Sequence, residues 1–164
     1  MKSIFGQIQR LYELAVRMFA GLRSPFLLAV RLYWGWQLTE TGWGKLHNLP
    51  HVVEFFTSLN LPAPGPTAVF VSVVELVGGI FLVLGFFTLP TCIAVVIDMM
   101  VAYITADSEA FKSFFSDPGK FYNADPYTFL FAGLLLLIFG PGKLSLDHLL
   151  ARYVFKKEEV RTEP

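Results

Sequence analysis

The segment from Thr67 to Phe87, TAVFVSVVELVGGIFLVLGFF, constrains the chain most, because it is long and apolar enough to cross a bilayer. Its fourteen Leu, Ile, Phe and Val residues contribute roughly −4 to −8 kcal/mol to membrane insertion. That gain outweighs one charged residue, so the segment inserts although Glu75 lies near its middle. A carboxylate at this depth is expected to face protein or a ligand, because lipid cannot solvate it.

Composition places the whole chain in the membrane class. Of its 164 residues, 54% are hydrophobic and 16% are charged, whereas an average soluble domain has about 25% charged residues. The formal net charge of +0 gives no electrostatic reason to bind nucleic acid. The single cysteine, Cys92, cannot form an internal disulfide, and we interpret it as a packing residue. The sequence therefore predicts one membrane domain that lipid and its own helices stabilise.

Hydropathy predicts an all-α fold, a transmembrane four-helix bundle over residues 26–140. The fourth apolar segment is short for a span and ends at the helix-breaking Gly140–Gly142. The four expected spans are Phe26–Trp43, Thr67–Phe87, Leu89–Thr105 and Pro126–Phe139.

Amphipathic helices that lie in the membrane surface are expected at both ends, over residues 1–24 and 145–157. Ser145 is a candidate N-cap of the second, and Pro50 favours the start of a short helix between the first two spans. Lys and Arg concentrate in the two terminal segments. The positive-inside rule then predicts a multi-pass protein of a bacterial-type inner membrane with both termini in the cytoplasm.

Charged residues inside the expected spans are the candidate functional residues. The first span has only six strongly apolar residues and should be sheltered by its neighbours. Helical spacing and depth allow Arg31, Glu75 and Asp98 to converge in the bundle core. One interpretation is a structural Arg31–Glu75 ion pair that fixes helix packing. The other is catalytic: two carboxyl groups beside one guanidinium share a proton near neutral pH, which suits quinone chemistry or proton coupling.

Other polar residues give weaker patterns. Glu40 points to the opposite side of its helix from Arg31, and we expect it to face Lys45, an outer loop or a second subunit. His47, His51 and Glu54 resemble a weak metal site, although Pro50 interrupts the helix that would align the two rings. Loop packing is the alternative explanation for these three residues.

Aromatic side chains in the first and third spans suggest a pocket for an aromatic or isoprenoid ligand. The alternative is that they only pack or anchor the helices at the membrane interface. Together with the charged residues, the candidate ligand-binding set is Arg31, Trp34, Lys45 and Tyr103. The sequence holds no phosphate-binding loop, nucleophile triad or cysteine-rich metal site, so any redox chemistry needs a bound cofactor such as a quinone, or a partner subunit.

From Leu28 to Asp147 the chain resembles the DoxX family of small four-helix membrane proteins. The resemblance depends on VRLYWGWQLTETGWGKL, LNLPAP, VELVGGIFLVLGFFTLP and FLFAGLLLLIFGPGKLSLD. It implies an Arg early in the first span, a Glu before paired glycines in the second, and a closing Gly-Pro-Gly followed by Ser-x-Asp. Some members of this family are subunits of a thiosulfate:quinone oxidoreductase, and others are associated with redox and detoxification complexes.

These patterns lead to one functional interpretation and two alternatives. The chain is interpreted as a membrane subunit of a redox system that binds a quinone or similar lipophilic ligand near Glu75, Asp98 and Arg31. Arg31 would orient the ligand or keep a carboxylate ionised, and Glu75 or Asp98 would relay a proton. The alternatives are a non-catalytic anchor or assembly partner of an oxidoreductase or metal-handling complex, and a small transporter. Self-association and the identity of a protein partner are left open.

Overall fold

A computed structural model describes residues 2–159, with side chains placed for residues 7–153. Every regular element in this part of the chain is a helix. Four helices form the bundle: α1 (Lys2–His47), α3 (Pro64–Leu84), α4 (Thr88–Thr105) and α7 (Pro126–Phe139). Shorter or peripheral helices are α2 (Leu49–Ser58), α5 (Ser108–Lys112), α6 (Pro118–Tyr122) and α8 (Leu146–Glu159). The all-α prediction is confirmed, and the predicted apolar segments match α3, α4 and α7 within three residues.

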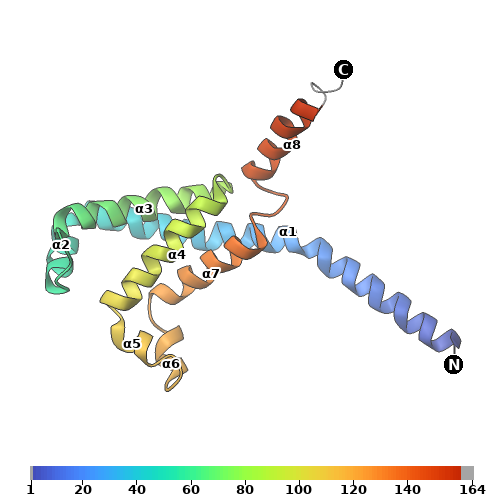
Figure 1. Cartoon of the computed structure of the whole chain (residues 1–164), viewed down its shortest axis with the longest axis horizontal. Coiled ribbons are helices and arrows are strands. Elements are labelled where there is room, and N and C mark those ends of the chain that lie inside the picture. The colour runs from blue at the N-terminus through green and yellow to red at the C-terminus, as the bar shows by residue number, and fades with distance from the viewer. Residues whose placement is uncertain (1, 160–164) are drawn as a thin grey trace.

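The four long helices close into a ring of contacts. The C-terminal half of α1 packs on α3 and α7, and α4 packs on the same two helices. By length and composition, α3 and α4 are each apolar enough to cross a membrane, and α7 is a shorter apolar helix. The N-terminal half of α1 and helix α8 both leave the bundle at one end, which we call the terminal end (Figure 1). Helices α2, α5 and α6 lie at the opposite end.

Helix α1 corrects the predicted boundary between a surface helix and the first span. It runs unbroken for 46 residues through Pro25. Proline removes the hydrogen bond to the carbonyl of Gly21, but that turn is exposed, so water or lipid headgroups can satisfy the carbonyl. Buried Leu27 and the bond from the Lys143 N–H to the Ser24 hydroxyl, 3.1 Å, hold the helix just beyond the proline. These contacts stabilise the helix across a residue that usually ends one.

Glycines set the register between antiparallel α1 and α3. A Cβ built on Gly42 would lie 2.7 Å from the Ser72 carbonyl oxygen and 2.8 Å from the Leu76 Cα. A Cβ on Gly35 would lie 3.0 Å from the Gly79 carbonyl oxygen. The two backbones approach so closely only because these positions lack side chains. This register places Lys45 near Glu75 and, about three turns away, Arg31 beside Gly85.

Hydrogen bonds join the segment after α7 to the terminal end of the bundle. Both Asp147 oxygens accept bonds of 2.8 Å from N–H groups at the start of α4: one from Phe87, the N-cap, and one from Thr88, the first helical residue. The Asp147 N–H donates to the Gly85 carbonyl, and fully buried Arg31 donates to the Leu144 carbonyl. We call Arg31, Gly85, Leu144 and Asp147 the terminal clasp.

Ser145 lies next to this clasp and caps α8 as predicted. Its hydroxyl accepts the His148 N–H at 3.1 Å, three residues along the chain. The Gly-Pro-Gly and Ser-x-Asp residues therefore serve a structural role here, because they return the chain to α1 and to the turn between α3 and α4.

Replacing Asp147 with Ala should lower the free energy of unfolding by about 1–2 kcal/mol, because α4 loses the acceptor for its first two N–H groups. Denaturant titration in detergent would measure the change. The matched control is Asp125→Ala, because Asp125 precedes α7 but its side chain makes no capping bond. Equal losses in the two variants would contradict the capping role of Asp147.

At the opposite end, α2 begins beside Pro50 as predicted, with proline in its first turn. Tyr103 is fully buried, and its hydroxyl donates to the Phe121 carbonyl at 2.7 Å while the two rings stack. Lys120 donates to Glu109 at 2.7 Å, and this bond holds the pKa of the exposed Glu109 carboxyl below its usual value. These contacts tie α5 and α6 to the end of α4.

Candidate functional site

A cavity of about 390 Å³ lies between α2, α3, α4 and the end of α1. Its walls are mainly apolar, with Phe55 and Phe56 from α2, Val71 from α3, and Met99 and Ala102 from α4. The volume is within the range of small-molecule pockets, roughly 300–1,000 Å³. The cavity is therefore large enough for a ring-sized lipophilic molecule.

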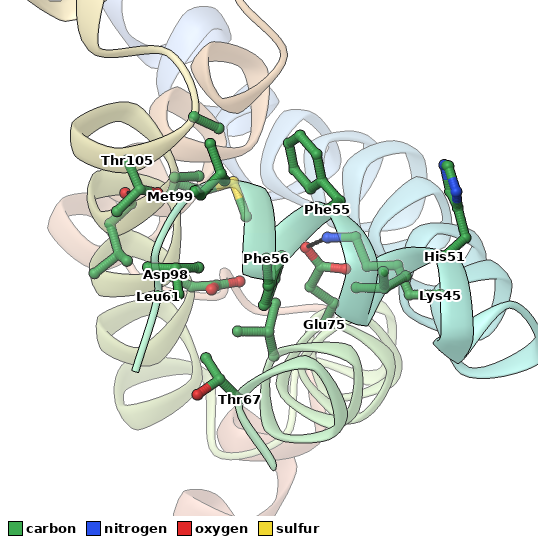
Figure 2. Close-up of a pocket in the computed structure, with 16 residues that line it drawn as sticks. Lys45, His51, Phe55, Phe56, Leu61, Thr67, Glu75, Asp98, Met99 and Thr105 are labelled. Carbon is green, nitrogen blue, oxygen red and sulfur yellow. Dashed lines mark hydrogen bonds and ion pairs between the residues drawn. The ribbon is translucent and has the colours of Figure 1, made fainter. Parts of the chain in front are cut away.

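Three charged side chains reach this apolar cavity from three different helices (Figure 2). Lys45 Nζ lies 2.5 Å from Glu75 Oε1, and the side-chain exposures are 29% and 4%. Asp98, from α4, points into the cavity from the facing wall. Lys45 follows Gly42 by about one turn, so the close packing of α1 on α3 positions the ammonium group at Glu75.

The carboxyl oxygens of the cavity are not all satisfied by protein. Glu75 Oε2 is buried without a hydrogen-bond partner. Asp98 makes no side-chain hydrogen bond within residues 7–153. Two carboxyl groups and one ammonium group thus leave several acceptor positions open in an apolar enclosure. Such an arrangement can accept hydrogen bonds or protons from a bound molecule.

The predicted convergence of Arg31, Glu75 and Asp98 is correct for the two carboxyl groups and wrong for Arg31. Glu75 and Asp98 share the cavity, but Arg31 belongs to the terminal clasp. Arg31 contacts Gly85, which lies ten residues from Glu75 on α3, a rise of about 15 Å. The partner of Glu75 is Lys45, which corrects the predicted Arg31–Glu75 pair. It also removes Lys45 from the three alternatives given for Glu40, which were Lys45, an outer loop and a second subunit.

The aromatic residues that were predicted to bind a ligand lie outside the cavity. Trp34 packs against the hydrophobic core of the bundle, and Tyr103 bonds to Phe121. Neither residue lines the cavity. The cavity wall instead takes its aromatic groups from α2, where Val52, Phe55, Phe56 and Leu59 recur at helical spacing. That spacing, following Pro50, is the sequence signal from which an apolar face on α2 could have been predicted.

The histidines near α2 do not form a metal site in this structure. His47 Nδ1 lies 2.9 Å from the Trp43 carbonyl, and its ring packs on the Trp43 ring. His51 and Glu54 are exposed on α2. Within the part of the chain that the structure describes, no three His, Cys, Asp or Glu side chains are grouped to hold a metal ion.

Comparison with known proteins gives one match. The model of the DoxX family matches residues 26–108, just over half of the chain, and this range includes Arg31, Lys45, Glu75 and Asp98. No curated protein and no solved structure shows significant similarity. Family membership associates the chain with membrane redox or oxidoreductase systems. The match and the all-helical bundle together show that this chain belongs to the DoxX family of membrane proteins.

Proposed function

We propose that the protein is a membrane subunit of a redox system and binds a quinone-type ligand in the cavity of Lys45, Glu75 and Asp98. The observation that carries this proposal is the buried Glu75 Oε2, which has no hydrogen-bond partner and lies in an apolar cavity that the half-buried Asp98 also lines. Buried acceptors without partners are costly, and a ligand that supplies donors would remove that cost. A ligand with a polar ring and an apolar tail matches both the charged residues and the walls.

The proposal includes a four-span topology with both termini in the cytoplasm of a bacterial-type inner membrane. Both terminal helices leave the bundle at the same end, which suits an even number of spans (Figure 1). Arg10, Arg17, Arg23, Lys143 and Arg152 are near that end, as the positive-inside rule requires of the cytoplasmic side. Glu75 and Asp98 are then about midway along α3 and α4, whereas Thr67 and Thr105 lie near helix ends. The cavity therefore extends from the middle of the bilayer toward the end of the bundle opposite the termini.

The charges of the cavity favour the reduced form of such a ligand. A quinone ring offers only acceptors, for which the cavity lining provides the Lys45 ammonium group, the His51 ring and the hydroxyl groups of Thr67 and Thr105. A quinol offers two hydroxyl donors, and Glu75 Oε2 and Asp98 provide acceptors for both. We therefore assign Glu75 and Asp98 to accepting hydrogen bonds from the hydroxyl groups. They would receive the two protons when a partner redox subunit takes the two electrons of the quinol, and Lys45 pairs with Glu75 and positions it.

A size-matched pair of substitutions on α4 tests the binding site. Ala102 lines the cavity, whereas Ala94 is exposed on the outside of the same helix. In nanodiscs, Ala102→Trp should weaken binding of a short-chain quinol analogue at least tenfold, since the indole occupies the ring position. Ala94→Trp should leave binding unchanged. Failure of the folded wild-type protein to bind quinol or quinone would overturn the proposal, as would equal binding by both variants.

The Lys45–Glu75 pair also supports a second function. In this second function the ion pair, whose Nζ and Oε1 atoms are 2.5 Å apart, has a structural role alone: it positions α1 on α3. The protein would then be a non-catalytic anchor or assembly partner for a protein of a redox or detoxification complex. In that case Glu75→Gln changes stability alone, and a partner protein copurifies with the chain in the absence of any quinol binding.

A further inference from the structure

Glu40 is the charged residue of the bundle that its own helices do not cover. It is exposed, whereas Arg31 and Glu75 are buried and Asp98 is half-buried. Its neighbours on α1 fix its depth: Thr39 lies against Gly79, and Gly42 lies against Ser72 and Leu76. These α3 residues are near the middle of a helix that is apolar enough to span a membrane. In the proposed topology Glu40 would therefore face lipid at mid-depth, where a carboxylate is least tolerated.

The surface around Glu40 is a shallow depression with mainly apolar and aromatic walls and two polar side chains, Gln37 and Glu40. A depression of about 470 Å³ is lined by Ala29, Leu32, Tyr33, Trp36, Gln37 and Glu40, all on one side of α1. Tyr33 and Trp36 are 59% and 61% exposed. Gln37, one turn before Glu40, carries an amide donor on the same side of the helix. Lipid cannot supply donors to the carboxylate, but an adjacent protein surface can.

We propose that a second copy of this chain packs on this face of α1 and forms a parallel two-fold dimer. Copies inserted in the same orientation are related by an axis along the membrane normal, so identical residues meet at equal depth. Gln37 of each copy then lies about 4.5 Å in depth from Glu40 of the other, close enough for its long side chain to donate across the axis, and the contact forms twice. The patch is self-complementary, because its donor and its acceptor lie one turn apart. The depression accepts the aromatic side chains of the second copy.

The remainder of α1 continues the same face beyond the bundle. Ile8, Ala15, Leu22, Ala29 and Trp36 recur every seven residues, and Leu11 and Met18 complete a heptad pattern in the first half. Because α1 is unbroken at Pro25, this stripe drifts around the helix by only about 20° per heptad. Ile8, Leu11, Met18 and Leu22 are 57–67% exposed in a segment that leaves the bundle (Figure 1). Two parallel copies of α1 would bury this stripe.

Disulfide trapping in native membranes tests the face directly. Trp36→Cys should give a covalent dimer on mild oxidation, because the two-fold axis brings the two thiols together. Ile97→Cys is the matched control, since Ile97 is 58% exposed on α4 away from this face. The buried Cys92 is common to both variants and to the wild type. No dimer at Trp36→Cys, or equal yields at both positions, would overturn the proposal.

The substitution Glu40→Leu tests whether Glu40 contacts a second copy of the chain or faces lipid. Loss of two reciprocal hydrogen bonds should raise the dimer dissociation constant about tenfold in liposomes, measured by energy transfer between labelled copies. Ile97→Ala should leave that constant unchanged. A monomeric wild-type protein, an unchanged dissociation constant for Glu40→Leu, or association only with a different protein would contradict the dimer. Quinol binding by the wild type is measured separately, so failure here does not affect the proposed function.

Discussion

Replacing Gly42 with Val should abolish the folded bundle, with a loss of at least about 3 kcal/mol in the free energy of unfolding. The new Cβ would meet the Ser72 carbonyl oxygen and the Leu76 Cα, which are backbone atoms of α3 that cannot rotate away. Helix α1 would have to move outward, and the contact that places Lys45 at Glu75 would be lost with it.

Titration with denaturing detergent, followed by tryptophan fluorescence, would measure this loss. Gly44→Val is the control, because nothing lies within 4 Å of a Cβ at Gly44 on the same helix. Gly44→Val changes helix propensity by the same amount as Gly42→Val, and it should lower the free energy of unfolding by less than about 1 kcal/mol. Near-equal costs for the two variants would show that α1 and α3 do not meet at Gly42.

Replacing Lys45 with Met should destabilise the protein by about 3 kcal/mol. The substitution leaves the Glu75 carboxylate, 4% exposed, without its cation in an apolar cavity. The value is at the lower end of the range for buried pairs, because Lys45 itself is 29% exposed and partly solvated. The double variant Lys45→Met with Glu75→Leu should recover most of this loss, because it removes both charges.

Lys112→Met is the control for Lys45→Met, since Lys112 is exposed on α5 and should tolerate the change within about 0.5 kcal/mol. The same detergent titration measures all three variants. If Lys45→Met costs no more than Lys112→Met, the Lys45–Glu75 pair contributes nothing to the fold. If the double variant remains as unstable as the single one, the loss comes from packing rather than from an isolated charge.

Much of the architecture could be predicted from local patterns. Apolar runs predicted α3, α4 and α7, Pro50 predicted the start of α2, and the Ser145 hydroxyl caps α8. The surface helix over residues 1–24 and the first span from Phe26 were expected as separate elements, whereas α1 is continuous through Pro25. Tertiary contacts of Ser24 and Leu27 outweigh the local preference of proline there. Local rules describe a helix in isolation, and they do not include the stabilisation that a neighbouring chain segment supplies.

The partner of Glu75 could not be derived from depth alone. Arg31 and Lys45 lie on the same face of α1, 14 residues or about four turns apart, and both have side chains long enough to reach a carboxylate. The choice depends on the register between α1 and α3, which the close contacts of Gly35 and Gly42 set. Because a sequence does not show which glycines of two helices meet, Arg31 and Lys45 could not be distinguished before the structure.

Photolabelling tests most directly whether a quinone-type ligand occupies the cavity of Lys45, Glu75 and Asp98. The reconstituted protein would be illuminated with a photoreactive quinol analogue, and the modified peptides would be mapped by mass spectrometry. We predict labels on the cavity-lining parts of α2 and α4, around Phe55 and Ala102, that excess unlabelled quinol removes and Asp98→Asn weakens. Labels confined to lipid-facing positions such as Ala94 and Ile97, and insensitive to competing quinol, would contradict it.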